Sequence, residues 1–293
     1  MNTALQIYSM GDHCHQLDDS LPDIKELTQQ VTGKSFRRIG RFIQLAMIGA
    51  TRCTNLSVPA DTAVYLASGR GDLETTLDIM KELFAHGQTP KPLAFVNTVS
   101  NAACFYVAQL LKLQSRSNYV CNRYFAFESA LQLAATDLLM NTASSALIGS
   151  IDVVTHPLDE HRQRLQLAKN IHLAEGTHWL WIGKPDAARP RLGEVIAVEH
   201  FADRDALFAW SDLHAAANTA VSRGQFVNDG EWNALTSRIA HSAIFDYRAD
   251  RGYYDSQSGA AIGEFLRSDC KADVLLHINA DADGQYSAML VSR

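Results

Sequence analysis

Residues 118–152 read NYVCNRYFAFESALQLAATDLLMNTASSALIGSID, and this stretch decides the fold class. Residues 118–122 are short and β-prone, and the segment after them carries apolar side chains at helical spacing. That apolar stripe consists of Phe127, Leu131, Ala135, Leu138 and Leu139. Residues 145–154, SALIGSIDVV, then form an apolar run typical of a buried strand. A strand, a helix and a strand in this order indicate a layered α/β fold.

The same alternation continues on both sides of this stretch. Towards the N-terminus we expect a helix at 36–50, a buried strand at 62–68 and a helix at 72–86. Beyond it, the predicted strands are 177–182, 194–200, 274–278 and 287–291, and the predicted helices are 205–221, 232–240 and 259–266. No Gly/Ser/Pro-rich linker divides the chain, so we predict a single domain, 1–293, with pseudo-halves at about 1–155 and 156–293.

The composition excludes several classes of protein. The chain has 293 residues, 47% hydrophobic and 20% charged, which is enough apolar material for a sizeable core and too much for a disordered chain. A formal net charge of −6 gives no support for nucleic-acid binding, which needs a basic face. Neither a long apolar run nor a secretory signal is visible, so we expect no membrane span. Five scattered cysteines favour a reducing cytoplasm over a disulfide framework.

Two short motifs are weak signals for binding. His13-Cys14-His15 offers soft ligands for zinc, but adjacent side chains diverge in a strand and no second ligand pair stands at finger spacing. We therefore expect no metal and no cofactor. Residues 68–72, SGRGD, follow a strand and resemble part of a phosphate-binding turn, although the full Gly-x-Gly-x-x-Gly pattern is missing. A tight strand-to-helix turn that needs glycine explains this segment better.

Residues 118–152 also resemble the heart of a β-ketoacyl synthase, in which a strand, a sharp elbow, a helix and a second strand follow one another. In that family the elbow carries a nucleophilic cysteine, and the helix N-terminus behind it lowers the thiol pKa. Further segments resemble the family in the same order along the chain. They are RRIGRF at 37–42, NAA at 101–103, EGT at 175–177, KPDAAR at 184–189, SGAA at 258–261 and NADADG at 279–284.

The chain departs from this family at the positions that carry its chemistry. A gapless match places Tyr124 at the nucleophile position, with Cys121 earlier, in the strand. A phenol with a pKa of ~10 is ~0.1% ionised at neutral pH, so Tyr124 is a poor acyl acceptor. The match puts Ser256 where the family has a histidine, and the chain has no His-Gly-Thr motif. Asp281 and Asp283 replace the family's Phe-bearing C-terminal loop.

The joint loss of these groups resembles a chain length factor, a catalytically inactive ketosynthase homologue that pairs with an active one. The short form most resembles the ketosynthase-like subunit of aryl polyene type II polyketide clusters. The resemblance implies a thiolase-like fold with α/β/α/β/α layers, truncated relative to a full ketosynthase. It also implies a heterodimer with an active ketosynthase, contact with an acyl carrier protein through that complex, and an acyl tunnel near the interface. The implied tunnel or interface residues are Phe95, Ser100, Asn101, Ala102, Ala103 and Phe105, and Val107, Leu110 and Leu111 are candidates for the same surface.

Two other hypotheses stay open at this point. In one, the chain is an active acyltransferase of the same fold, and Cys121, Cys104 or a histidine has taken over the chemistry. In the other, it is an unrelated α/β protein that binds a nucleotide through Gly69-Arg70-Gly71. A nucleophilic thiol needs a lowered pKa and solvent access. The environment of each cysteine therefore distinguishes an active acyltransferase from an inactive subunit.

Overall fold

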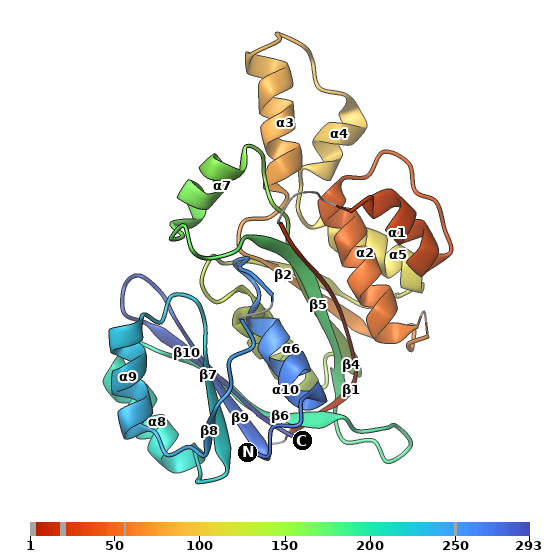
Figure 1. The fold of residues 1–293 in the computed structure, drawn as a ribbon. Helices are drawn as coiled ribbons and strands as arrows, with labels where there is room; N and C mark the ends of the chain where they lie inside the picture. The colour runs from red at the N-terminus through yellow and green to blue at the C-terminus, as the bar shows by residue number, and fades with distance from the viewer. Residues whose placement is uncertain (1–3, 18–21, 56, 249–250) are drawn as a thin grey trace.

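The computed structural model describes residues 4–17, 22–55, 57–248 and 251–293, and within them ten strands form one continuous mixed sheet (Figure 1). The strands are β1 (Leu5–Gln16), β2 (Ala63–Ser68), β3 (Ser117–Cys121), β4 (Ser145–Asp152), β5 (Ala174–Gly183), β6 (Gly193–Phe201), β7 (Thr219–Arg223), β8 (Ala243–Ile244), β9 (Val274–Ala280) and β10 (Tyr286–Ser292). The helices are α1 (Ile24–Thr32), α2 (Arg41–Thr54), α3 (Leu73–Phe84), α4 (Pro92–Asn97), α5 (Ala102–Leu111), α6 (Ala126–Leu139), α7 (Leu158–Leu165), α8 (Arg204–His214), α9 (Asp229–Arg238) and α10 (Ser258–Arg267). Across the sheet the strand order is β3-β2-β4-β5-β1-β6-β10-β9-β7-β8.

The two halves of the sheet repeat one pairing scheme. In the first half β2 pairs in parallel with β3 and β4, while β5 pairs antiparallel with β4 and with β1. In the second half β7 pairs in parallel with β8 and β9, while β10 pairs antiparallel with β9 and with β6. A short antiparallel pairing of residues 5–7 with 193–195 joins the halves at the centre of the sheet. The chain is therefore built from two copies of one α/β unit.

Strand β5 pairs with β4 and β1, so its pairing assigns it to the first half of the sheet. By the pairing scheme, the two halves of the sheet meet between Gly183 and Gly193, which end β5 and begin β6. The predicted pseudo-halves divide earlier in the chain, at about 155 and 156.

Helices form three layers around the two half-sheets. Helices α2 and α5 pack on the outer face of the first half, and α8 and α9 cover the outer face of the second (Figure 1). Helices α6 and α10 contact each other and lie between the halves, and α6 touches β2 and β4 as well as β6 and β10. The result is an α/β/α/β/α arrangement, as predicted. Within the described residues, no helix is both long and apolar enough to cross a membrane.

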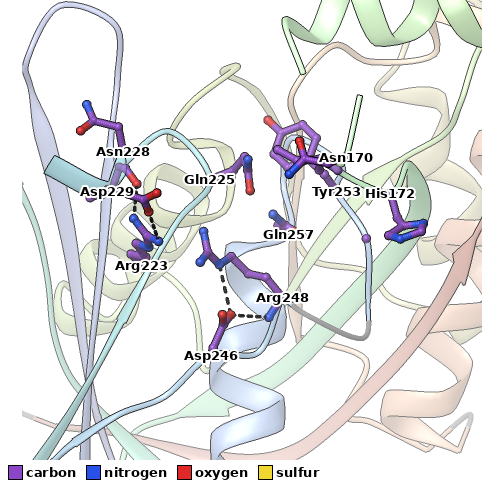
Figure 2. Close-up of a pocket in the computed structure, with 13 residues that line it drawn as sticks. Asn170, His172, Arg223, Gln225, Asn228, Asp229, Asp246, Arg248, Tyr253 and Gln257 are labelled. Carbon is purple, nitrogen blue, oxygen red and sulfur yellow. Dashed lines mark hydrogen bonds and ion pairs between the residues drawn. The ribbon is translucent and has the colours of Figure 1, made fainter. Parts of the chain in front are cut away.

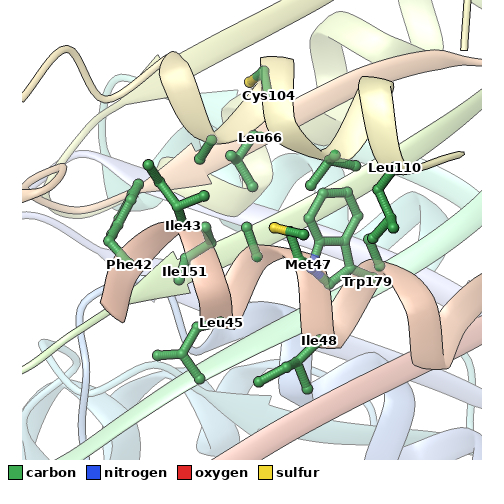
Figure 3. Packing of buried hydrophobic residues seen from close by; sticks show 14 of the residues in the cluster. Phe42, Ile43, Leu45, Met47, Ile48, Leu66, Cys104, Leu110, Ile151 and Trp179 are labelled. Atoms are coloured by element: carbon green, nitrogen blue, oxygen red, sulfur yellow. The ribbon is translucent and has the colours of Figure 1, made fainter. Parts of the chain in front are cut away.

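The core of the first half forms around α2 and Trp179 (Figure 3). Helix α2 is buried along nearly its whole length, because β1, β4, β5, α1 and α5 surround it. The fully buried Trp179 ring lies so close to two glycines that a Cβ at Gly49 or Gly149 would come within 2.4 Å of it. Trp179 therefore belongs to the core, whereas the nearby Trp181 is half-buried.

Three sequence-based assignments of secondary structure were wrong. The helix predicted at 205–221 ends at His214, and residues 219–223 form strand β7 instead. Ala215 is already extended, with ψ 137°, so the alanine run that follows only imitates a helical continuation. The helix predicted from 36 begins at Arg41, since Arg38 has φ 61°. The long strand β1 was not predicted, because its polar second half hides the alternation.

Candidate functional site

Tyr124 stands in the turn between β3 and α6, where the sequence placed it. Asn122 Oδ1 holds this turn by accepting from the backbone N–H of Tyr124 at 3.1 Å and of Phe125 at 3.4 Å. The Tyr124 ring packs edge-on against Phe226 from the other half, with centroids 4.8 Å apart. The Arg123 guanidinium lies 5.1 Å from the Tyr124 ring and 5.5 Å from the Phe226 ring. The aromatic cluster of Tyr124 and Phe226 therefore occupies the elbow, and the Arg123 guanidinium packs against both rings.

Ser256, at the expected histidine position, belongs to the same neighbourhood. Phe226 also contacts the ring of Tyr253 at 5.9 Å, and the Tyr253 hydroxyl donates to Asp255 Oδ1 at 2.6 Å. Ser256 follows Asp255 directly, is fully buried, and its hydroxyl has no hydrogen-bond partner among the described residues. Tyr253 thus connects the segment that carries Ser256 with the ring pair of Phe226 and Tyr124, and neither position flagged from sequence is itself a histidine.

Two side chains, one from each half, join the halves by hydrogen bonds to the backbone of the other half. Asp152, at the end of β4, accepts from the backbone N–H of Ser256 at 2.8 Å, just before α10. Asn279, near the end of the equivalent strand β9, donates to the carbonyl oxygen of Tyr124 at 2.7 Å, just before α6. The same Asn279 amide donates to Glu128 Oε1 at 3.1 Å. Each half therefore fixes the chain that leads into the central helix of the other half.

Four of the five cysteines lack the environment of a nucleophile, namely Cys14, Cys53, Cys104 and Cys121. Burial raises the pKa of the Cys104 thiol to about 12 and that of Cys14 to about 11. Burial also raises the pKa of Cys53 to about 12. Cys121 is exposed at the end of β3, yet partial burial and the carboxyl groups of two aspartates raise its pKa as well. A raised pKa lowers the thiolate fraction at neutral pH, which is the opposite of what covalent catalysis requires.

The histidines that a relocated mechanism would need are also unsuited to it. Burial lowers the pKa of His178 and of His277 to about 3, so both rings are neutral at physiological pH. His178 is bonded to the Tyr254 hydroxyl and His277 to the Tyr247 hydroxyl. Within the described ranges, no group of three His, Cys, Asp or Glu side chains could hold a metal ion.

The glycine turn after β2 has no free backbone donors for a phosphate. Asp152 Oδ1 accepts from the Gly69 N–H at 3.0 Å, and Ser68 Oγ accepts from the next two N–H groups at 3.3 and 2.8 Å. Ser100 Oγ accepts from the Asp72 N–H at 3.1 Å. A carboxylate therefore occupies the place where an anion would bind, and the segment is the tight turn that its glycines suggested. Ser100, predicted as an interface residue, braces this turn.

The predicted tunnel or interface residues separate into exposed and buried ones. Phe95 and Phe105 are 62% and 60% exposed, Asn101 is exposed, and Ala102 and Ser100 are half-buried. Ala103 is fully buried in the core beside α2, so it does not contribute to the exposed surface of the isolated chain. The same holds for three further residues of α5, namely Val107, Leu110 and Leu111.

Helices α3 and α4 project from the body of the molecule (Figure 1). Several of their apolar side chains are exposed, and the two helices are here called the apolar arm. Helix α3 is amphipathic in sequence, yet none of its residues is buried in the isolated chain. The exposed apolar side chains of the arm and of the adjoining α5 are Met80, Leu83, Phe84, Leu93, Phe95, Val96, Val99 and Phe105. The apolar stripe at 72–86 was visible in the sequence, but nothing there indicated that it would stay uncovered.

Comparison with known proteins gives a clear result only at the level of structure. No family model and no curated protein matches the sequence. The ishigamide ketosynthase/chain length factor matches with a TM-score of 0.77 at 16% identity, over 99% of both chains. An acyl-carrier protein of a type II polyketide synthase in complex with its ketosynthase bound to the hexaketide gives a TM-score of 0.77 at 14% identity, over 100% of this chain and 99% of the other. The chain has the thiolase-like ketosynthase fold.

A third structure extends this likeness to a β-ketoacyl synthase. A β-ketoacyl synthase from Burkholderia phymatum STM815 gives a TM-score of 0.73 at 11% identity, over 99% of both chains. The thiolase-like fold expected from the sequence is therefore confirmed. At this level of identity the ketosynthase fold is shared, while the residues at its nucleophile elbow have to be judged from this chain itself.

Proposed function

We propose that this protein is a non-catalytic, chain-length-factor-type subunit that pairs with an active ketosynthase and shapes its acyl tunnel. The biosynthetic setting is type II polyketide, aryl polyene or fatty-acid-like chain extension. The observation that carries the proposal is the occupied elbow at Tyr124. Condensation needs a thiolate and donors that stabilise the carbanion and oxyanion. At this elbow a phenol packed against Phe226 and Arg123 replaces the thiol.

The raised thiol pKa values argue against the alternative of a relocated nucleophile. The backbone N–H groups of the turn at 68–72 already donate to side-chain oxygens of the protein, and this argues against a nucleotide site. Neither alternative has an observation in its favour. The chain has the ketosynthase fold, but its elbow lacks the nucleophilic thiol that condensation needs. This combination favours a structural role beside an active subunit.

The apolar arm supports pairing with a ketosynthase-type partner. Obligate interfaces usually bury more than ~2,000 Å² and are richer in apolar side chains than the rest of a surface. The arm exposes apolar side chains, and the edge strand β3 pairs with β2 on one side and has no neighbour among the described strands on the other. An edge strand left open is a site for pairing with another chain. One of the fold neighbours is itself a ketosynthase/chain length factor, which fits this choice of partner.

The position of the exposed phenylalanines suggests how the subunit would limit chain length. Phe95 in α4 and Phe105 in α5 project from the surface that we assign to the partner, beside Asn101 and Ala102. A growing polyene on the partner is rigid and straight, so its extension would stop where its tip meets a bulky side chain. Another fold neighbour is an acyl-carrier protein in complex with a ketosynthase, and we assign delivery of extender units to such a carrier acting on the partner.

The direct test is co-expression with an active ketosynthase from the same gene neighbourhood. We expect a stable 1:1 complex that makes condensed products, whereas this chain alone makes none. Size-exclusion chromatography with mass determination and a product assay measure both properties. A well-behaved monomer with no affinity for the ketosynthase would contradict the pairing, and condensed product from the purified chain alone would contradict the non-catalytic role.

A further inference from the structure

A pocket of about 480 Å³ lies between the loop before β5, the loop after β7 and the segment that leads into α10 (Figure 2). Small-molecule sites in proteins commonly measure ~300–1,000 Å³. None of the described residues that line it belongs to α3, α4 or α5. The pocket is therefore large enough for a small organic molecule and separate from the surface assigned to the ketosynthase partner.

Two ion pairs line this pocket, and in both of them the cation is buried more deeply than the anion. Arg223 bonds Asp229 at 2.6 Å, and 17% of the arginine side chain is exposed against 88% of the aspartate side chain. Arg248 bonds Asp246 at 3.2 Å, and the corresponding exposed fractions are 19% and 51%. Water screens an exposed charge more strongly than a buried one. The inside of the pocket is therefore more positive than the formal charges of its lining suggest.

Arg248 keeps hydrogen-bonding capacity that its ion pair does not use. Its Nε–H donates to Asp246 Oδ1 at 3.2 Å, and its backbone N–H donates to the same oxygen at 3.0 Å. Its terminal nitrogens Nη1 and Nη2 have no hydrogen-bond partner among the described residues, and both are accessible to solvent. Figure 2 shows this guanidinium among the residues that line the pocket. A molecule inside the pocket can therefore reach both nitrogens.

The second guanidinium of the pocket is already engaged by the protein. Arg223 Nη1 donates to the carbonyl oxygen of Val227 at 3.0 Å, and Nη2 donates to Asp229 at 2.6 Å. Of the described arginines that line the pocket, only Arg248 thus has two terminal nitrogens without a partner. Two adjacent nitrogens of one guanidinium match the two oxygens of a carboxylate or a phosphate.

The charge and the walls of the pocket favour a carboxylate over a phosphate. A carboxylate carries a single negative charge, whereas a phosphate monoester carries about 1.5–2 at neutral pH. One free guanidinium end balances a single charge, and Asp229 and Asp246 at the rim repel any surplus. Ile171 and Val227 line the same cavity and offer apolar surface to the organic part of a ligand.

We propose that this pocket binds a small organic carboxylate, which Nη1 and Nη2 of Arg248 hold end-on. The two carboxylate oxygens accept from the terminal N–H groups, and the organic part of the ligand lies against Ile171 and Val227. Arg223 lines the same pocket and adds positive charge near the bound anion. Binding does not require the ketosynthase partner, so the test gives its result whether or not the pairing occurs.

The test uses matched probes on the full chain in a buffer free of carboxylate and phosphate. Benzoate and benzamide have nearly the same shape, but only benzoate carries a negative charge and two acceptor oxygens. We expect benzoate to bind at least about tenfold more tightly than benzamide, because its bonds to the guanidinium are charge-assisted. Phenyl phosphate serves as the third probe and should bind less tightly than benzoate. Isothermal titration calorimetry measures the three affinities.

Two variants separate recognition by Arg248 from a general effect of charge. Arg248→Gln removes the guanidinium and should weaken benzoate to the level of benzamide. Arg191→Gln removes a guanidinium that pairs with Glu194 on the loop between β5 and β6 and does not line the pocket, so benzoate binding should stay unchanged. If Arg248→Gln does not fold, the comparison of the probes on the unaltered chain decides alone.

Three results would overturn the proposal. Equal binding of benzoate and benzamide would show that the pocket does not recognise an anion. Full benzoate affinity in a folded Arg248→Gln would remove this residue from the site. Tighter binding of phenyl phosphate than of benzoate would contradict the assignment to a carboxylate.

Discussion

Tyr124 contributes to the contact between the two halves of the molecule. Its ring contacts Phe226 from the second half, and its carbonyl oxygen accepts from Asn279. An edge-to-face aromatic pair contributes about 0.5–1.5 kcal/mol beyond its buried area. The residue on which the proposed function rests therefore also helps to hold the two halves together.

Restoring a thiol at this position should not restore condensation. We expect Tyr124→Cys to give no condensed product from acyl and malonyl thioesters, because Ser256 and the surrounding residues supply no imidazole for decarboxylation or oxyanion binding. It should lower the melting temperature, since the contact with Phe226 is lost. The assay is product analysis by mass spectrometry, with the active ketosynthase as positive control. Turnover by the variant alone would show that the missing groups are present elsewhere.

Glu128 should make the stability of the protein depend on pH. The residue is fully buried, only its Oε1 has a hydrogen-bond partner among the described residues, and burial raises its pKa from 4.5 to about 7. The folded state then holds the proton more tightly than the unfolded state. The free energy of unfolding should therefore fall as the pH rises from about 4.5 to about 7, by at most roughly 3 kcal/mol.

The matched variant Glu128→Gln should make this slope shallower. Asp152 and Glu74 should keep the remainder, because burial raises the pKa of each to about 7 as well. We expect Glu128→Gln to be more stable than the unaltered chain at pH 8 and to differ little near pH 5. The exposed Glu199→Gln serves as control and should keep the full slope. Urea unfolding at a series of pH values measures all three proteins, and a slope in Glu128→Gln as steep as that of the unaltered chain would contradict the role of Glu128.

The residue patterns that could be read from sequence are local ones. Tyr124 and Ser256 were located by counting from neighbouring strands and helices, because those spacings are fixed by secondary structure. The hydrogen bonds of Asp152 to Ser256 and of Asn279 to Tyr124 could not be predicted by counting along the chain. Each joins positions more than a hundred residues apart, and only the packing of the two halves brings them together.

At the scale of elements, α4 and α5 carry the prediction about chain length. Phe95 and Phe105 are mostly exposed, so Phe95→Ala and Phe105→Ala should change the stability of the chain by less than about 0.5 kcal/mol. Burial in a core would instead cost ~3–5 kcal/mol. In the reconstituted complex both variants should yield longer products. Melting temperature and product length are to be recorded for the same samples.

Ala103→Phe is the matched control for this pair. Ala103 is fully buried against the core, so a ring there should destabilise the chain without acting on product length directly. Unchanged product length in stable complexes of both phenylalanine variants would remove these side chains from the tunnel.

The apolar arm carries a separate prediction about binding. Phe84, at the end of α3, is 77% exposed, and Phe84→Ser should leave the isolated chain as stable as before. In the complex, loss of a buried aromatic contact costs about 2 kcal/mol, which is roughly a 30-fold rise in Kd. Leu213→Ser is the control, since Leu213 is 82% exposed on α8, far from the arm (Figure 1). Equal effects of the two changes on Kd would place the interface elsewhere.

Elements with a clear pattern of apolar residues were predictable from sequence. Elements whose structure or exposure depends on contacts with distant parts of the chain were not. The runs at 62–68 and 145–154 are apolar throughout, because both faces of β2 and β4 are buried, and they were recognised as strands. Strand β7 was mistaken for helix because the alanines before it continue the apolar pattern of α8. The exposure of α3 was not predictable, since amphipathicity shows that a helix has an apolar face but not whether the same chain covers it.

At the scale of the whole molecule, the fold is two copies of one unit joined across β1 and β6. Tyr124 stands just before α6 and Ser256 just before α10, so the starts of the two central helices lie at the contact between the halves. The sequence revealed the fold class because the order of strands and helices can be read from local patterns. It suggested two pseudo-halves, but the pairing scheme that relates them depends on contacts between distant strands.

The measurement that tests the central claim most directly is the intact mass of both subunits after the reconstituted complex has been incubated with an acyl thioester. The account predicts an acyl adduct on the ketosynthase partner and an unchanged mass for this chain. An acyl group on this chain, traced by peptide mapping to Tyr124 or to a cysteine, would contradict it.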